Sequence, residues 1–168
     1  MALIKRIGYG QVEPNHLSAQ RNGQVYGQLP ANADIKVLEN GQFVKYDYAK
    51  GECNFTGAGE WMLVLNEVKL YDSFWRESYK DFAMKASNYD KGVMTPRVMK
   101  TMPGDIFTTN CVAGSETAEG VELVVEDVLG INANGYLEKN AESDIKFQVV
   151  KTYTMPDGQP AVKVMRIK

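Results

Sequence analysis

The sequence predicts an all-β protein: an antiparallel β-barrel or sandwich with an extended N-terminal arm and at most one or two short helices. Short β-prone runs recur along the chain, and glycine-containing turn sequences separate them at intervals of about eight to twelve residues. The alternation of strands and helices that is typical of a parallel α/β sheet is missing. We therefore divide the 168 residues into an N-terminal arm, residues 1–33, and a β-domain, residues 34–168.

The N-terminal arm is rich in glycine, glutamine and asparagine, and turn residues break it into short extended pieces. It is too polar to form a core of its own, so we expect it to be mobile in the free protein and ordered on a partner; a frayed terminus is the alternative. Deletion of residues 1–30 should then leave the β-domain folded. Large apolar residues still recur along the arm, and we predict them as partner contacts: Leu3, Ile7, Val12, Leu17, Val25 and Tyr26.

The first half of the β-domain contains a predicted hairpin and a hydrophobic strand. An Asn-Gly pair at residues 40–41 lies between β-prone runs at 35–38 and 42–48, which is a strong hairpin signal. Residues 61–71 form the most hydrophobic run of the chain. Its unbroken apolar start predicts a strand buried on both faces, and its alternating end predicts a half-buried edge.

Residues 72–92 allow two interpretations. Apolar residues at helical spacing favour a short helix, whereas the density of aromatic side chains also fits a long loop held against the β-domain. The aromatic residues form either a second small core or a contact patch, because tryptophan, tyrosine and arginine are common interface anchors. Trp75 and Arg76 therefore join the predicted partner contacts.

The second half of the β-domain again contains strands punctuated by turns. We expect a hairpin formed by residues 97–100 and 106–110, one strand over 121–128, and a turn at 130–135. A closing hairpin is expected around Pro156-Asp157-Gly158, where proline presets φ and glycine accepts a left-handed conformation.

Side chains suited to catalysis are scarce, so we predict no enzyme activity, no cofactor and no metal site. The single histidine, His16, lies in the polar N-terminal arm and cannot form a histidine cluster. Glu122 and Glu126 share one face of a predicted strand, where a solvated pair of carboxylates is the simpler interpretation. Cys53 and Cys111 fit no zinc motif and are predicted to be reduced, buried and structural.

The formal net charge of −2 gives the protein no positive field that would attract nucleic acid or an anionic membrane. The start of the sequence has neither the apolar run of a signal peptide nor the length of a membrane span. We therefore expect a soluble protein made in a reducing cytoplasm, with neither nucleic acid nor membrane among its partners.

Four stretches together resemble the decoration, cement or auxiliary head proteins of tailed-bacteriophage capsids: PNHLSAQRNGQVYGQLPAN, LENGQFVKYDY, GDIFTTN and GYLEKN. The resemblance is one of texture over most of the chain. It implies a β-rich protein on the outer surface of a virion capsid, made in the host cytoplasm. It also implies an arm that lies along neighbouring subunits, and no catalytic residues. The implied partners are the major capsid protein and further copies of the chain in a small oligomer, often a trimer.

Two other functions remain open from the sequence. One is another β-rich virion component, such as a head fibre, tail or connector protein. The other is a cellular β-barrel module that binds a small ligand or a carbohydrate, which a large apolar cavity in the structure would favour.

Overall fold

The protein was analysed as a computed structural model that describes residues 1–68 and 76–168, with only the backbone described at residues 76–78. These residues form fifteen β-strands in antiparallel sheets, one four-residue α-helix and three 3₁₀-helices. The predicted all-β class is therefore confirmed. The helices are α1 (Ala19–Asn22), η1 (Arg76–Asp81), η2 (Ala86–Asn88) and η3 (Asp90–Gly92).

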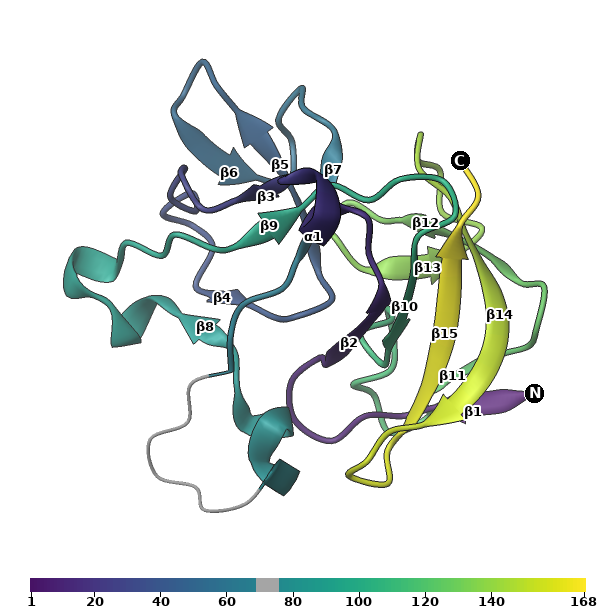
Figure 1. The fold of residues 1–168 in the computed structure, drawn as a ribbon. Helices are drawn as coiled ribbons and strands as arrows, with labels where there is room; N and C mark the ends of the chain where they lie inside the picture. Colours follow the sequence, from purple (N-terminus) through teal and green to yellow (C-terminus); the bar gives the residue numbers. More distant parts are fainter. Residues whose placement is uncertain (69–75) are drawn as a thin grey trace.

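Two larger sheets dominate the fold (Figure 1). The six-stranded sheet has the order β13 (Leu137–Lys139), β12 (Val128–Ile131), β14 (Phe147–Thr154), β15 (Pro160–Arg166), β10 (Ile106–Thr109) and β2 (Val12–His16). The five-stranded sheet has the order β3 (Val25–Tyr26), β9 (Val98–Met99), β7 (Trp61–Val64), β5 (Phe43–Asp47) and β6 (Glu52–Asn54). Two further pairs are β1 (Ala2–Ile4) with β11 (Val121–Leu123), and β4 (Val37–Leu38) with β8 (Met84–Lys85).

The main core lies between the two larger sheets. The ring centroid of Phe43 on β5 lies 6.3 Å from that of Phe107 on β10 and 5.5 Å from that of Phe147 on β14. Aliphatic side chains from both sheets fill the space around these rings. Two sheets that share one core through their inner faces form a β-sandwich, one of the two architectures that the sequence allowed.

The five-stranded sheet is buried on its other face as well. Val44, Met62 and Val98 belong to a second apolar cluster, which Leu38 of β4 and Met84 of β8 cover. All four residues of β7 are consequently buried. The prediction that the run starting at residue 61 is buried on both faces is confirmed for β7, while residues 69–71 of that run lie outside the described residues.

The C-terminal hairpin forms as predicted. Strands β14 and β15 pair from Phe147↔Arg166 to Thr154↔Pro160, with one bulge near Val149. Gly158 in the turn has φ 84°, the left-handed conformation that the Pro-Asp-Gly sequence led us to expect.

Two other predicted hairpins are wrong. The Asn40-Gly41 turn joins β4 to β5, but β4 pairs with β8 while β5 pairs with β6 and β7. The turn at 102–105 likewise joins strands of different sheets, β9 and β10. Both turns carry the chain from one sheet to another. A buried carboxylate lies at each of them, Glu39 beside the first turn and Asp105 in the second. Local turn chemistry cannot reveal such a layer change, because it depends on partners distant in the sequence.

The stretch predicted as one strand over residues 121–128 is divided in two. β11 ends at Leu123 and β12 begins at Val128. Glu126 lies between them with φ 78°, a left-handed conformation that ends a strand. The separation of the two strands allows β11 to pair with β1 while β12 enters the six-stranded sheet.

The N-terminal arm is extended, as predicted, but its strands are built into the sheets. β1 pairs with β11, β2 forms one edge of the six-stranded sheet, and β3 forms one edge of the five-stranded sheet. Ile4, Leu17 and Ala19 are buried in the main core. The arm therefore contributes to the same folded unit as residues 34–168, although its composition is polar.

Within residues 72–92, the described part contains 3₁₀-helices and the two-residue strand β8. The short α-helix that the spacing favoured does not form over residues 76–92. Lys91 has φ 54° and Gly92 has φ 70°, and these two left-handed residues turn the chain back towards β9. Residues 72–75 lie outside the described residues.

Candidate functional site

The predicted contact residues of the N-terminal arm occupy three kinds of environment. Leu3 is 49% exposed and Ile7 is 65% exposed, so both are accessible on the surface. Val12, Val25 and Tyr26 are half-buried and pack against the two apolar clusters. Leu17 is only 4% exposed and belongs to the main core, so it packs within this chain rather than against a partner.

The other two predicted contacts cannot be placed as side chains. Trp75 lies outside the described residues, and Arg76 opens η1 with only its backbone described. Of the predicted contact residues whose side chains are described, Leu3 and Ile7 are therefore the most accessible.

A buried ion pair anchors the arm between these two exposed residues. The Arg6 guanidinium contacts the Glu39 carboxylate through both terminal nitrogens, and the Nη2–Oε1 distance is 3.3 Å. The same carboxylate accepts hydrogen bonds from the backbone N–H of Gly10 (2.6 Å) and from the Tyr136 hydroxyl (3.0 Å). Arg6 Nε also donates to Ser115 Oγ at 3.0 Å. These contacts fix the arm to Glu39 and Ser115, and Tyr136 holds the Glu39 carboxylate from a third part of the chain.

Burial has opposite effects on the ionisable groups of this cluster. Burial acts to lower the pKa of Arg6, but the neighbouring Cys111 and Glu39 outweigh it and the pKa is raised. Burial raises the pKa of the Tyr136 phenol, and the Glu39 carboxylate raises it further. Arg6 is therefore charged and Tyr136 is a neutral hydrogen-bond donor at neutral pH. The cluster satisfies its own charges, which is typical of a structural anchor.

Further polar contacts fix the rest of the arm. Asp105 accepts hydrogen bonds from the backbone N–H and the hydroxyl of Ser18, each at 2.9 Å. The backbone N–H of Gln11 donates to Asn110 Oδ1 at 2.8 Å, and that of Ile7 donates to Gln159 Oε1 at 2.6 Å. Ile7 therefore has a fixed backbone and an exposed side chain.

The two cysteines are buried free thiols, which confirms the predicted burial. Burial raises the pKa of Cys53 to about 12 and raises the pKa of Cys111 as well. Because the thiolate is the reactive form, neither side chain has the properties of a nucleophile at neutral pH.

The polar residues that were considered for catalysis lie on the surface. His16 is exposed at the end of β2, and Glu122 and Glu126 are exposed near β11, the solvated environment that was predicted for this pair. Across residues 1–68 and 76–168, no group of three or more His, Cys, Asp or Glu side chains is arranged to hold a metal ion.

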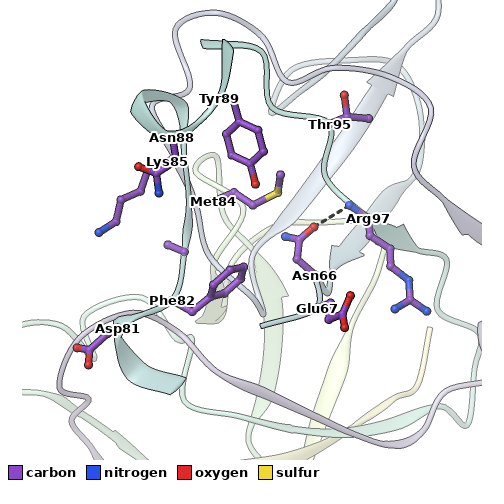
Figure 2. A pocket seen from close by; sticks show the side chains of 11 residues that line it. Asn66, Glu67, Asp81, Phe82, Met84, Lys85, Asn88, Tyr89, Thr95 and Arg97 are labelled. Carbon is purple, nitrogen blue, oxygen red and sulfur yellow. Dashed lines mark hydrogen bonds between the residues drawn. The ribbon is translucent and has the colours of Figure 1, made fainter. Parts of the chain in front are cut away.

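A pocket of about 550 Å³ lies between the segment 81–89 and the chain around Asn66 and Arg97 (Figure 2). Phe82, Met84 and Tyr89 line one side. Phe82 and Met84 belong to the second apolar cluster, whereas Tyr89 is 39% exposed. One wall of the pocket is therefore formed by residues that also pack in the second apolar cluster.

The opposite side of this pocket is polar. Asn66, Glu67 and Arg97 lie there, and Asn66 Oδ1 accepts a 2.8 Å hydrogen bond from the backbone N–H of Arg97. No sequence pattern identified these residues as a site. The one relevant signal was the crowding of aromatic residues, and the polar wall comes from segments that only the fold brings together.

Comparison with known proteins identified no matching family model, no matching curated protein and no matching solved structure. In the part of the chain that is described, no helix is long and apolar enough to cross a membrane.

Proposed function

We propose that this protein is a non-enzymatic structural protein that binds and stabilises the outer surface of a tailed-phage capsid. The major capsid protein is the proposed partner, with further copies of the chain in a small oligomer on the virion. The textural resemblance to decoration proteins and the all-β fold support this proposal. The two buried thiols also support it, as does the Arg6–Glu39 ion pair, whose charges are compensated within the chain; each fits a structural role.

The observation that carries the proposal is the exposure of Leu3 and Ile7 on a firmly anchored chain. Ile4, next to Leu3, is fully buried, and Arg6, next to Ile7, forms the buried ion pair with Glu39. The backbone that presents the two exposed side chains is therefore already ordered. A contact surface that is ordered in advance loses less conformational entropy on binding.

Co-sedimentation with empty shells assembled from major capsid protein tests the proposal. The Leu3→Ser, Ile7→Ser double variant should bind shells at least about tenfold more weakly, because two accessible apolar anchors are removed. Its melting temperature should stay close to that of the wild type, because exposed substitutions change stability by no more than about 0.5 kcal/mol.

Val93→Ser is the matched control, since Val93 is 51% exposed and lies in a loop outside the N-terminal arm. It should leave shell binding unchanged. Wild-type protein that fails to sediment with shells would contradict the capsid role. Wild-type binding that the double variant retains would assign the contact to another surface.

One observation favours the cellular ligand-binding module as a second candidate, namely the pocket in Figure 2. Its volume of about 550 Å³ is within the range of small-ligand sites. The same pocket is compatible with a virion protein, so it separates the candidates only when its ligand is known.

A further inference from the structure

The chain contains Asn-Gly pairs in three different environments. They are Asn22-Gly23, Asn40-Gly41 and Asn134-Gly135. In such a pair the backbone nitrogen of the glycine can attack the side-chain amide of the asparagine, because glycine has no Cβ that obstructs the approach. The dipeptide is the same in all three places, so the fold decides which pair can react.

The reaction is deamidation through a cyclic imide. Attack by the glycine nitrogen forms a C–N bond to Cγ of the asparagine, and the side-chain nitrogen leaves as ammonia, which takes up the glycine N–H proton through solvent. Water then opens the imide at either carbonyl carbon and gives aspartate or isoaspartate. Water is the only co-reactant, and each event adds one negative charge. The reaction needs a free asparagine side chain, a glycine N–H released from its hydrogen bond, and room for the peptide group to rotate.

Asn40-Gly41 meets none of these requirements. Asn40 is 5% exposed; its Oδ1 accepts from the Asn66 backbone N–H at 2.8 Å, and its Nδ2 donates to the Asn66 carbonyl at 3.1 Å. The Gly41 N–H donates to the Val64 carbonyl at 2.9 Å. A Cβ on Gly41 would lie 2.6 Å from the Cβ of Cys111, so the peptide group has no room to rotate.

Asn134-Gly135 has an exposed asparagine but a fixed peptide group. The Gly135 N–H donates to the Asn132 carbonyl at 3.0 Å, and the Asn134 carbonyl accepts from Gln42 Nε2 at 3.0 Å. The Phe43 N–H donates to the Gly135 carbonyl at 2.7 Å. A Cβ on Gly135 would clash with the Phe43 carbonyl, so this peptide group cannot rotate either.

Asn22-Gly23 lies at the exposed end of α1, the one-turn helix before β3 (Figure 1). The Asn22 side chain has no hydrogen-bond partner among the described residues. The Gly23 N–H donates to the Ala19 carbonyl, and Gly23 has φ 65°. Apart from its chain neighbours, no atom of the described residues lies within 4 Å of the position that a Cβ on Gly23 would take. The peptide group therefore has room to rotate once its hydrogen bond opens.

That hydrogen bond opens at low cost. A helix of one turn has little cooperative stabilisation, and helix ends fray. The start of α1 is fixed, since Ala19 is buried and Ser18 is hydrogen-bonded to Asp105. Residues 21–23 are all exposed, so opening can be confined to them. The Gly23 nitrogen is consequently released more readily than the glycine nitrogen of the other two pairs.

We propose that Asn22-Gly23 is a site of spontaneous deamidation in the folded protein, whereas the fold protects Asn40 and Asn134. The proposal is independent of capsid binding and goes beyond it. Both products place a new carboxylate at the end of α1. Isoaspartate also lengthens the backbone by one atom between α1 and β3, an edge strand of the five-stranded sheet.

Incubation of the full-length protein in ¹⁸O-labelled water at mildly alkaline pH, followed by peptide mapping, tests the proposal. Water opens the imide, so deamidation during the incubation incorporates ¹⁸O, and deamidation during digestion in ordinary water does not. Asn22 should react at least about tenfold faster than Asn40 and Asn134, which corresponds to a barrier lower by about 1.4 kcal/mol. In urea that unfolds the chain, the three rates should converge because the protecting contacts are lost.

Anion-exchange chromatography follows the same reaction on the intact chain. The wild type should give one acidic species, with one more negative charge than the net −2 of the unmodified chain. Asn22→Gln should prevent its formation, because glutamine would have to close a larger ring. Asn134→Gln is the matched control at another exposed Asn-Gly pair and should leave the acidic species unchanged. Melting curves of both variants should superimpose on that of the wild type, since both positions are exposed.

Three results would overturn the proposal. The first is that Asn40 or Asn134 deamidates in the folded protein as fast as Asn22. The second is that Asn22 reacts in urea but not in the folded protein, which would show that α1 protects it. The third is that the acidic species still forms in Asn22→Gln. None of these results bears on shell co-sedimentation, so the two proposals fail independently.

Discussion

The N-terminal arm and the C-terminal hairpin are both extended, but they are held in opposite ways. The hairpin β14–β15 is stabilised by its own ladder, which pairs residues close in sequence from Phe147↔Arg166 to Thr154↔Pro160. The arm has no internal ladder and depends on distant partners, such as Glu39, Asp105 and Asn110. The pairing of an extended segment can therefore be predicted when its partner is close in the sequence. When its partners are distant, only its extended conformation can be predicted.

Of the changes that test this comparison, removal of the arm should reduce the stability of the protein most. The structure revises the expectation that deletion of residues 1–30 spares the β-domain. The deletion removes buried Ile4 and Leu17, each worth about 2–5 kcal/mol, and leaves Glu39 without Arg6. Such a loss is comparable with the total stability of an ordinary domain, about 5–15 kcal/mol. We expect the truncated protein to be unfolded.

Circular dichroism and urea titration of the truncated and full-length proteins measure this effect. A cooperative transition in the truncated protein, at the urea midpoint of the full chain, would show that the arm is an accessory and would restore the first expectation. Deletion of Ile167 and Lys168, the exposed residues after β15, provides the control. It removes backbone hydrogen bonds to Lys146 and one from Arg166 but no buried side chain, so it should cost far less than removal of the arm.

The arm's buried ion pair should give the next largest effect. Glu39→Gln removes the buried countercharge of the Arg6 guanidinium, whose side chain is 3% exposed, and leaves only the half-exposed Glu116 carboxylate at 3.9 Å. Breaking one partner of a buried pair costs about 3–5 kcal/mol. The free energy of unfolding from urea titration should fall by that amount, whereas Glu122→Gln, at an exposed carboxylate of β11, should change it by no more than about 0.5 kcal/mol.

An Arg6→Met, Glu39→Met variant sharpens the same test. Replacement of both charges by apolar side chains of similar size removes the unpaired charge, so this variant should be more stable than Glu39→Gln. If Glu39→Gln unfolds at the same urea concentration as the wild type, the ion pair is not an anchor, and the arm is held by its apolar contacts and its other hydrogen bonds.

The sequence predicted what depends on local pattern. Val162 and Val164 alternate with outward residues along β15, and Asp157-Gly158 supplies a turn, so the hairpin followed directly. The unbroken run in β7 likewise indicated burial on both faces. These features need only residues that are neighbours in sequence or share one strand.

The sequence did not predict what depends on distant polar partners. Nothing near Arg6 identifies Glu39 as its partner, and a lysine–arginine pair is normally a solvated surface feature. The same holds for Asn66 and Arg97, which form the polar wall of the pocket only after β7 and β9 pair. A buried polar contact of this kind needs only one residue from each of two segments. No periodic pattern in the sequence therefore marks it.

A substitution in the hairpin turn should have a smaller effect. Gly158 has φ 84° and open space where a Cβ would lie, so Gly158→Ala introduces backbone strain and no clash. We expect a loss of about 1 kcal/mol in the free energy of unfolding. Gly27→Ala is the matched control, because Gly27 also has open space but no left-handed φ. Equal stability of the two variants in urea would contradict this account of the turn.

The smallest expected effect concerns Asp157, where the two regions meet. Asp157 Oδ2 accepts from the arm's Gln11 Nε2 at 2.9 Å and from Gln159 Nε2 at 2.7 Å, and Oδ1 accepts from the Gln159 backbone N–H at 3.1 Å. Burial acts to raise the pKa of Asp157, but these hydrogen bonds outweigh it and the pKa is lowered. The charged form is therefore favoured by the fold.

The sign of the pH dependence follows from that lowered pKa. The folded state binds the Asp157 proton less readily than the unfolded chain, so the stabilisation is complete above the unfolded pKa of about 3.9 and is lost as the pH falls through the folded pKa. Asp127, whose pKa is lowered by Lys139 and by the Val124 N–H against the opposing effect of burial, contributes in the same direction.

Asp157→Asn should thus make stability less dependent on pH below about pH 4 without abolishing the dependence. The contribution of Asp157 at neutral pH should be below about 1 kcal/mol, because the side chain is only half-buried. Urea midpoints at several acidic pH values measure it, with exposed Asp144→Asn as the control. An unchanged pH profile in Asp157→Asn would mean that the charge of Asp157 does not stabilise the folded state.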